Sequence, residues 1–299
     1  MPALNDPRTP VARLRDRARS KTIGVLSLDP TSYDKAWTLL GIERATRDSD
    51  YLVSIVSVPV PTRRNLTTAV AGLRSLAVDG ILVVAPQQDT VDMLADLSGD
   101  IPLVAVASGP QESLSAVAID HYAGAAAATG HLLELGHHTV FHIAGPADRT
   151  SPGPRFAGWR DTLVAAGADV PLPMIGDWSA DVGYEFGCRL AARAEVTAVF
   201  VANDQMALGV LRAMFEAGRR VPDDVSVVGF DGTPQGEFFS PPLTTVRQNF
   251  NEMGRRSLEL LLTEIELGRD GRVQETIPAE LIIRASTAVA SSRALVAIV

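Results

Sequence analysis

Short apolar runs alternate along the chain with stretches in which apolar residues recur every three or four positions. The runs have the length and composition of strands that are buried on both faces. They cover residues 23–28, 52–58, 81–85, 103–107, 116–119, 139–144, 198–202 and 226–230, with further extended segments near residue 174 and over 244–248 and 276–283. The helical spacing predicts helices over residues 36–45, 66–77, 91–97, 123–135, 155–166, 183–194 and 253–267. Because strands alternate with crossover helices and the pattern runs through twice, the sequence predicts an α/β fold with two similar doubly wound parallel-sheet lobes.

One strand–helix–strand unit stands out. The apolar run Ala198–Ala202 ends at Asn203 and Asp204, two residues of the kind that cap helix N-termini, and a second buried run ends at Asp231. A unit of this length predicts parallel strands, and open α/β sheets bind ligands at the carboxyl ends of such strands. Asn203 and Asp231 are therefore candidate ligand contacts. Capping by Asn203 and Asp204, and a turn at Asp231, are the alternatives that the sequence leaves open.

Two further residues suggest a site for a neutral polyol. Arg155 is at the start of a predicted helix, where the positive end of the helix dipole disfavours a cation. Another interaction must therefore stabilise the guanidinium at this position. A fork of donors aimed at sugar hydroxyls would account for it, and so would a surface salt bridge. Trp178 lies in a polar Gly-Asp-Trp-Ser stretch, which favours the wall of a pocket over a core position. The carboxylate of Asp231 and the amide of Asn203 would suit vicinal hydroxyl groups.

Composition narrows the class of protein. Of the 299 residues 46% are apolar, which is enough for a large core, yet no apolar run reaches the ~18 residues that span a bilayer. A single cysteine, Cys188, excludes an internal disulfide, and its helical setting predicts a core position. The first twenty residues hold no apolar signal-peptide region, so we expect a cytoplasmic protein without membrane contact.

Charge is distributed unevenly along the chain. The net charge is −8, but residues 1–22 hold six basic residues against two acidic ones, a net +4, which leaves −12 for the remainder. A basic arm on an acidic body is typical of a DNA-binding segment joined to a sensing body. A basic tail without function is the alternative. With three prolines, the first twenty residues cannot hold a helix-turn-helix.

No catalytic or cofactor motif is present. We find no GxGxxG, GxxxxGK, CxxC or GxSxG pattern, so no enzyme activity and no cofactor is expected. Four histidines lie close together in the sequence, but their spacing matches no zinc pattern, and we expect structural roles. They are His131, His137, His138 and His142.

Three blocks carry a resemblance to a known family. VANDQMALG from residue 201, VPDDVSVVGFD from residue 221 and PPLTTVRQNF from residue 241 resemble the signatures of the LacI/GalR family of bacterial transcriptional repressors. The resemblance covers about residues 20 to 287 and implies a periplasmic-binding-protein-like fold of type I, with three crossovers and a ligand cleft between the lobes. The implied division is a basic arm over 1–21, an N-terminal lobe over 22–119 and 250–277, a C-terminal lobe over 120–249 and 278–287, and a tail over 288–299.

The resemblance also implies a ligand site. In the family, the arginine of the R-x-x-G-W block holds ligand hydroxyls, and the positions of Asn203 and Asp231 do the same, which assigns these roles here to Arg155, Asn203 and Asp231. Trp178 would cover the apolar face of the sugar, and Gln248 and Phe250 would line the same cleft. The chain departs from the family pattern in three places, so the identity of the sugar stays open. These places are Leu28–Ser32, the missing aspartate near Ala107-Ser108, and the loop 150–154 with its two prolines.

The function implied is that of an effector-sensing domain. A saccharide, for example a galactoside or another β-linked sugar, would control how a homodimer binds operator DNA. The segment Val11–Arg15 resembles the family's hinge helix with a different spacing, but a headpiece of about fifty residues is not found in this sequence, so we expect negligible operator affinity. A sugar receptor of a transporter has the same fold and is the alternative; the lack of a leader and of a lipidation cysteine argues against it.

Overall fold

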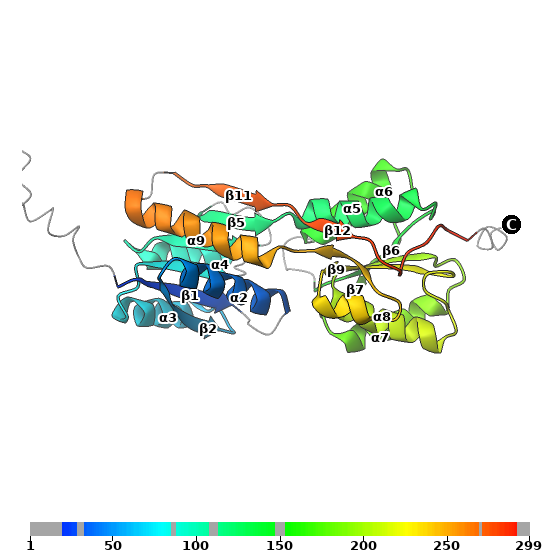
Figure 1. The fold of residues 1–299 in the computed structure, drawn as a ribbon, viewed down its shortest axis with the longest axis horizontal. Helices are drawn as coiled ribbons and strands as arrows, with labels where there is room; N and C mark the ends of the chain where they lie inside the picture. The colour runs from blue at the N-terminus through cyan, green and yellow to red at the C-terminus, as the bar shows by residue number, and fades with distance from the viewer. Residues whose placement is uncertain are drawn as a thin grey trace, which may run out of the picture. The chain divides into compact units, whose positions relative to one another are not determined.

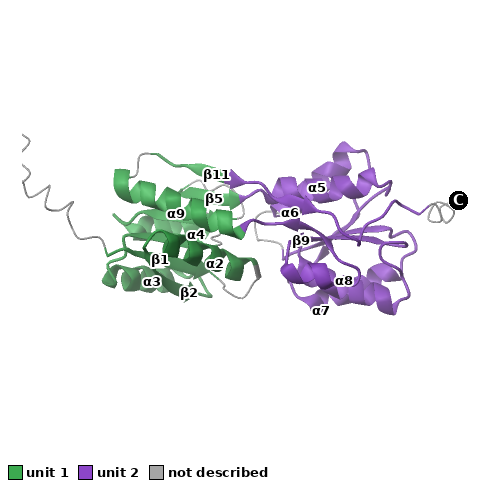
Figure 2. Ribbon diagram, viewed as in Figure 1, with its two compact units in different colours: residues 1–118, 250–275 green, residues 119–249, 276–299 purple. Residues whose placement is uncertain are grey.

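The computed structural model describes residues 20–28, 33–84, 88–107, 113–146, 153–268 and 271–291. The chain folds into two compact units, unit 1 with residues 1–118 and 250–275 and unit 2 with residues 119–249 and 276–299 (Figure 2). The chain therefore passes between the units three times. The basic arm up to residue 19, the hinge-like segment, residues 29–32, Ser108, residues 150–152 and the tail beyond residue 291 lie outside the described residues.

Unit 1 is a sheet covered by helices on both faces (Figure 1). Its described strands follow the order β11-β5-β4-β3-β1-β2. They are β1 (Thr22–Leu28), β2 (Leu52–Val58), β3 (Gly80–Val84), β4 (Leu103–Ala107), β5 (Ser115–Ile119) and β11 (Gln274–Ile277). The helices are α2 (Tyr33–Asp48), α3 (Arg63–Ser75), α4 (Gln88–Ser98) and α9 (Phe250–Leu267). One core forms where α3 and α4 pack on the sheet, while α9 packs against α2 and over β3 and β4.

Unit 2 repeats this architecture. Its described strands follow the order β12-β10-β9-β8-β6-β7. They are β6 (Phe141–Ala144), β7 (Met174–Ile175), β8 (Ala198–Val201), β9 (Ser226–Asp231), β10 (Thr244–Arg247) and β12 (Glu280–Ile282). The helices are α5 (His121–Glu134), α6 (Pro154–Ala165), α7 (Ala180–Ala191) and α8 (Asp204–Glu216), with a 3-10 turn η1 (Pro234–Phe238). The cores lie on opposite faces, one under α7 and α8 and the other under α5 and α6.

The strands of unit 2 from β6 to β10 are parallel. Val201 pairs with Ile143 of β6, Phe200 pairs with Val228 of β9, and Phe230 pairs with Val246 of β10. Strand β12 is antiparallel to β10 at the edge. The predictions of two doubly wound lobes and of parallel strands on either side of α8 are confirmed. No helix among the described residues is both long and apolar enough to cross a membrane.

Two predictions about local structure are wrong. The segment 276–283 is not one strand but parts of β11 and β12, because β11 joins the sheet of unit 1, β12 joins that of unit 2, and Pro278 between them has no N–H for a ladder. Cys188 is exposed rather than in the core. The face of α7 that packs on α8 is instead formed by small residues, including Gly183 and Gly187.

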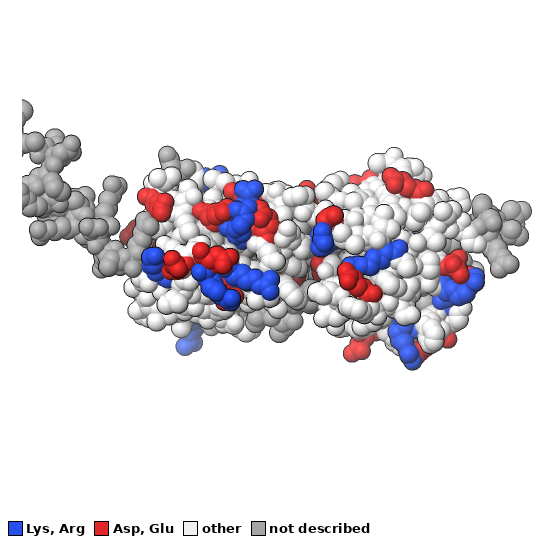
Figure 3. Space-filling view, in the orientation of Figure 1, with Lys and Arg blue, Asp and Glu red and all other residues white. Residues whose placement is uncertain are grey.

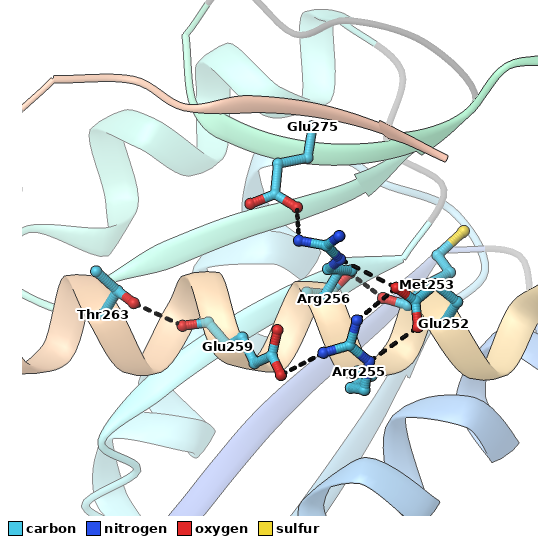
Figure 4. Close-up of polar contacts among 8 residues, drawn as sticks. Glu252, Met253, Arg255, Arg256, Glu259, Thr263 and Glu275 are labelled. Atoms are coloured by element: carbon cyan, nitrogen blue, oxygen red, sulfur yellow. Dashed lines mark hydrogen bonds and ion pairs between the residues drawn. The ribbon is translucent and has the colours of Figure 1, made fainter. Parts of the chain in front are cut away.

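Charged side chains of both signs are interspersed on the surface shown in Figure 3. On α9 they form a network in which Glu252 bonds Arg255 and Arg256, Arg255 also pairs with Glu259, and Arg256 reaches Glu275 of β11 at 3.5 Å (Figure 4). Hydrogen bonds from Arg255, supported by Arg256, lower the pKa of Glu252 to about 2. Because these groups are exposed to solvent, each pair contributes little to stability.

Helices α7 and α8 approach closely because glycines face each other. A methyl group added at Gly183 would overlap the backbone of Met206, and one added at Gly209 would overlap the carbonyl oxygen of Ala180. A backbone neighbour cannot rotate away as a side chain can, so neither position has room for a larger residue.

We expect Gly183→Ala to lower the free energy of unfolding by about 1–3 kcal/mol or more, since the two helices would have to separate. Gly130→Ala in α5 is the matched control, because nothing lies within 4 Å of the added methyl group and alanine favours helix. The control should raise the free energy of unfolding by ~0.4–1 kcal/mol. Denaturant unfolding of both variants measures this, and a Gly183→Ala protein as stable as the control would show that α7 and α8 are not in this contact.

Candidate functional site

Polar and aromatic side chains collect at the carboxyl edge of the sheet in unit 2. Asp231 is the last residue of β9 and Gln248 follows β10 directly. Asn203, Trp178 and Arg155 lie in the segments that follow β8, β7 and β6. Because these strands are parallel neighbours, their carboxyl ends lie along one edge of the sheet, which is the edge where doubly wound folds bind ligands. The candidates predicted for this lobe therefore share one edge.

Arg155 and Asp231 form a buried ion pair. The guanidinium Nη1 lies 3.4 Å from Asp231 Oδ1 and donates a hydrogen bond of 2.5 Å to the carbonyl oxygen of Ala202. The Phe230 ring lies under the guanidinium, 4.0 Å from Cζ to the ring centroid. The side chains are 11% and 5% exposed, so this is not the surface salt bridge that the sequence left open. The carboxylate, carbonyl and ring offset the cost of a cation at a helix N-terminus.

Gln248 connects this ion pair to a residue that the sequence did not single out. Its Nε2 donates to Asp231 Oδ1 at 2.7 Å, and its Oε1 lies 2.9 Å from His121 Nε2. Burial, and then the charge of Arg155, lowers the pKa of His121 to about 3, so the imidazole is neutral. The sequence could have indicated His121 as a candidate contact, because His121 lies two residues after the end of the strand 115–119, just as Asn203 lies two residues after the end of β8.

Asn203 and Trp178 form the second part of the group. Asn203 Oδ1 accepts the N–H of Met206 at 2.9 Å, so the capping role that the sequence left open as an alternative for Asn203 is present. Its Nδ2 donates to the carbonyl oxygen of Trp178 at 3.1 Å. The indole is 36% exposed, covers Gly145 so closely that a side chain there would collide with it, and lies 5.6 Å from the guanidinium of Arg155. Asn203 thus holds the segment that presents the indole to solvent.

Two of these residues have unusual backbone conformations. Trp178 has φ of 76° and Asp231 has φ of 110°, a region that residues with a side chain rarely adopt. Such strain costs roughly 1–3 kcal/mol per residue and is found where function requires a fixed geometry. Its occurrence at two of the predicted contacts supports a functional interpretation of this edge.

Phe250 belongs to the other unit of the chain. It is the first residue of α9 and belongs to unit 1, where its carbonyl oxygen packs against Gly41 and its side chain is buried. The other predicted contacts all belong to unit 2. Its proposed role in ligand binding therefore stays a prediction from the resemblance.

Asp204 has a structural role. Its carboxylate is fully buried and accepts hydrogen bonds from Thr245 Oγ1 at 2.6 Å and from the N–H of Thr233 at 2.7 Å, so it joins the start of α8 to β10 and to the loop after β9. Burial, only partly offset by these hydrogen bonds, raises the pKa of Asp204 to about 6. The carboxylate of Asp204 therefore stabilises the packing at the sheet edge and is not one of the candidate ligand contacts.

Three histidines outside this edge, His131, His137 and His142, are engaged within the protein, and His131 Nε2 lies 3.1 Å from Thr287 Oγ1. His137 Nδ1 bonds Thr197 and Nε2 bonds Ser226, both at 3.0 Å. His142 is stacked between Phe200 and Trp159. Across the described residues, no group of three or more His, Cys, Asp or Glu side chains could hold a metal ion.

The arrangement is suited to binding rather than to bond cleavage. Guanidinium and amide groups donate to hydroxyl oxygens, a carboxylate accepts from hydroxyl protons, and an indole packs on the apolar face of a sugar ring. The imidazole beside them bonds an amide rather than a nucleophile, so these side chains do not form a nucleophile–base pair.

The chain is similar to known proteins in sequence and in structure. Residues 129–287 match the family described as periplasmic binding protein-like domain. The chain is similar to the lactose operon repressor of Klebsiella pneumoniae, with 33% identity over 236 residues that cover 77% of this chain and 66% of that protein. It is also similar to the HTH-type transcriptional repressor PurR of Photobacterium profundum, with 32% identity over 95% of this chain and 86% of that protein. Among solved structures, the complex of the transcriptional regulator CelR with cellobiose has a TM-score of 0.79 at 31% identity and covers 90% of this chain and 85% of that chain. The matched region thus spans about two thirds of the length of the first of these relatives.

The buried carboxylate of Asp204 generates a prediction about pH. Its pKa is about 6 in the folded chain and 3.8 as the ordinary value, so folding takes up a proton between these pH values. The stability that this provides is complete below pH 3.8 and is lost as pH rises through 6. Relative to Asp204→Asn, the wild type should therefore gain on the order of 2 kcal/mol in unfolding free energy between pH 7 and pH 4, where the unfolded carboxyl group is itself partly protonated. Denaturant unfolding at several pH values measures this, and a pH-independent difference would contradict it.

Proposed function

Because this chain belongs to the LacI/GalR family of transcriptional regulators, we propose that it is the effector-sensing part of such a regulator and that a neutral saccharide is its effector. The observation that carries the proposal is the group of Arg155, Asp231, Asn203, Gln248 and Trp178 at one sheet edge. The similar repressors support the regulatory part of the proposal, and they oppose the alternative of a transporter receptor.

The chemistry of the edge favours a ligand without net charge. The charges of Arg155 and Asp231 compensate each other, and the neighbouring His121 is neutral. An anionic ligand would have to compete with Asp231 for the guanidinium, whereas hydroxyl groups can bond both partners without separating them. Trp178 offers an exposed aromatic face of the kind that packs on a sugar ring.

The finer proposal is a β-linked saccharide. The relative solved with cellobiose binds a β-linked disaccharide, and this chain is similar to it over most of its length. A galactoside is the second candidate, because of the similarity to a lactose operon repressor. We further propose that the chain forms a homodimer, and that the homodimer binds operator DNA only through a headpiece that is not among these residues. The homodimer would exist in two arrangements that differ in their affinity for DNA. The ligand can shift the equilibrium between them only because it binds one arrangement more tightly than the other, typically by ~1–3 kcal/mol.

Calorimetric titration of the protein with cellobiose, lactose, simple galactosides and a sugar phosphate tests the ligand class. We expect a neutral saccharide to bind and Asp231→Asn to weaken it roughly 10- to 100-fold, because hydrogen bonds to a charged group contribute ~1.5–3 kcal/mol. Asp169→Asn, an exposed aspartate of the same unit, is the matched control and should bind like the wild type. Undiminished binding by a folded Asp231→Asn protein would show that the saccharide binds elsewhere.

Trp178 gives an optical measurement of the same event. A sugar that covers the partly exposed indole removes water from it, so the tryptophan fluorescence should change on titration. In Trp178→Phe this change should disappear, although Trp37 and the fully buried Trp159 still emit and the aromatic face is kept. A change of the same size in the variant would place the ligand away from residue 178.

A further inference from the structure

Five side chains of unit 2 close a ring of contacts. His121 Nε2 lies 2.9 Å from Gln248 Oε1, Gln248 Nε2 lies 2.7 Å from Asp231 Oδ1, and Asp231 pairs with Arg155 at 3.4 Å. Arg155 lies over the aromatic ring of Phe230 at 4.0 Å, and the rings of His121 and Phe230 form a T-shaped pair with a centroid distance of 5.4 Å and an interplanar angle of 79°. All five residues are buried, with exposed fractions of the whole residue between 0% and 9%.

The chemistry of the ring fixes the orientation of the Gln248 amide. An ionised carboxylate can only accept hydrogen bonds, and the ion pair with Arg155 keeps Asp231 ionised. The atom of Gln248 that faces Asp231 must therefore be the NH₂ group, which leaves the carbonyl oxygen toward His121. A carbonyl oxygen can only accept, so His121 must carry its proton on Nε2.

The same surroundings exclude the other protonation states of His121. A neutral imidazole with its proton on Nδ1 would place a lone pair of Nε2 against the amide oxygen of Gln248. A cation would be buried near the guanidinium of Arg155, and burial together with that charge lowers the pKa of His121 to about 3. The neutral tautomer of His121 with its proton on Nε2 is therefore the one that satisfies all the contacts among these five residues.

We propose that His121 is a positioning residue of the saccharide site: by donating its Nε2–H to Gln248 it fixes the amide of that residue and, through the amide, the direction in which the Asp231 carboxylate faces the ligand. This inference rests on the proposed function. Without the donor, the buried amide oxygen of Gln248 loses its hydrogen-bond partner, so the side chain can move toward another donor and loosen its bond to the carboxylate. The carboxylate would no longer be held in one orientation for the ligand.

The first test compares two substitutions of one residue. His121→Phe keeps a ring against Phe230 but removes the N–H, and we expect saccharide affinity to fall about tenfold, the size of one net hydrogen bond in a buried site. His121→Gln places an amide N–H near the position of Nε2 and should restore affinity to within about threefold of the wild type. His142→Phe is the matched control, a buried histidine of the same unit stacked on aromatic rings, and should leave affinity unchanged.

A double-mutant cycle separates positioning from general loosening of the fold. In a Gln248→Met background the amide is gone, so His121→Phe should change affinity by less than about twofold. An equal loss in both backgrounds would overturn the positioning role, because the effect would then not pass through Gln248. Thermal unfolding of each variant identifies the ones that are folded at the titration temperature.

The tautomer provides a measurement that needs no ligand. Long-range ¹⁵N–¹H correlation spectra of histidine-labelled protein, assigned through the His121→Gln variant, should show the proton on Nε2 at pH 7. A proton on Nδ1, or a cation, would overturn the inference. If the wild type binds saccharide and a folded His121→Phe protein binds it equally well, the role of His121 is overturned but the proposed function stands. If the wild type binds no saccharide, the proposed function fails and the positioning role fails with it.

Discussion

A buried positive charge at the start of a helix governs the structure of the carboxyl edge in unit 2. The dipole of α6 disfavours Arg155 at its first turn, so the chain must compensate the guanidinium from elsewhere. The compensating groups are the carboxylate of Asp231, the carbonyl oxygen of Ala202 and the ring of Phe230, all at or just beyond the ends of β8 and β9. Because Phe200 pairs with Val228, these groups end at the same level, and the register of two strands therefore decides whether the charge can be buried.

The polar groups of this edge are held by hydrogen bonds within the protein. The carboxylate of Asp231 is bonded by Gln248, which in turn meets His121, and the amide of Asn203 caps α8 while it bonds the carbonyl of Trp178. Groups that are already ordered lose little entropy when a ligand binds, and this favours affinity in a site made of a few hydrogen bonds. The strained backbone at Trp178 and Asp231 is consistent with a geometry that the surrounding structure imposes.

Much of the fold could be predicted, and the errors have physical causes. Alternation of apolar runs with helical spacing placed β4 at its observed bounds and β1 within one residue, because strands buried on both faces leave a simple pattern. The pattern of an edge strand is weaker, which is why β11 and β12 were predicted as one strand. Cys188 was predicted in the core from its place in a helical pattern, but the close approach of α7 to α8 selects glycine for the contact face.

The sequence by itself determined the α/β architecture through its hydrophobic periodicity, and the family through three signature blocks. It also indicated the candidates Arg155, Asn203 and Asp231, because helix starts and strand ends are local features of the chain. The tertiary structure alone decided that Arg155 is buried against Asp231 and that His121 belongs to the same group. His121 and Gln248 are 127 residues apart, and they meet because α5 packs beside β10 and β9 in unit 2. Hydrophobic periodicity specifies which face of an element is buried, but the neighbours of that face follow from strand order, which is a property of the folded chain.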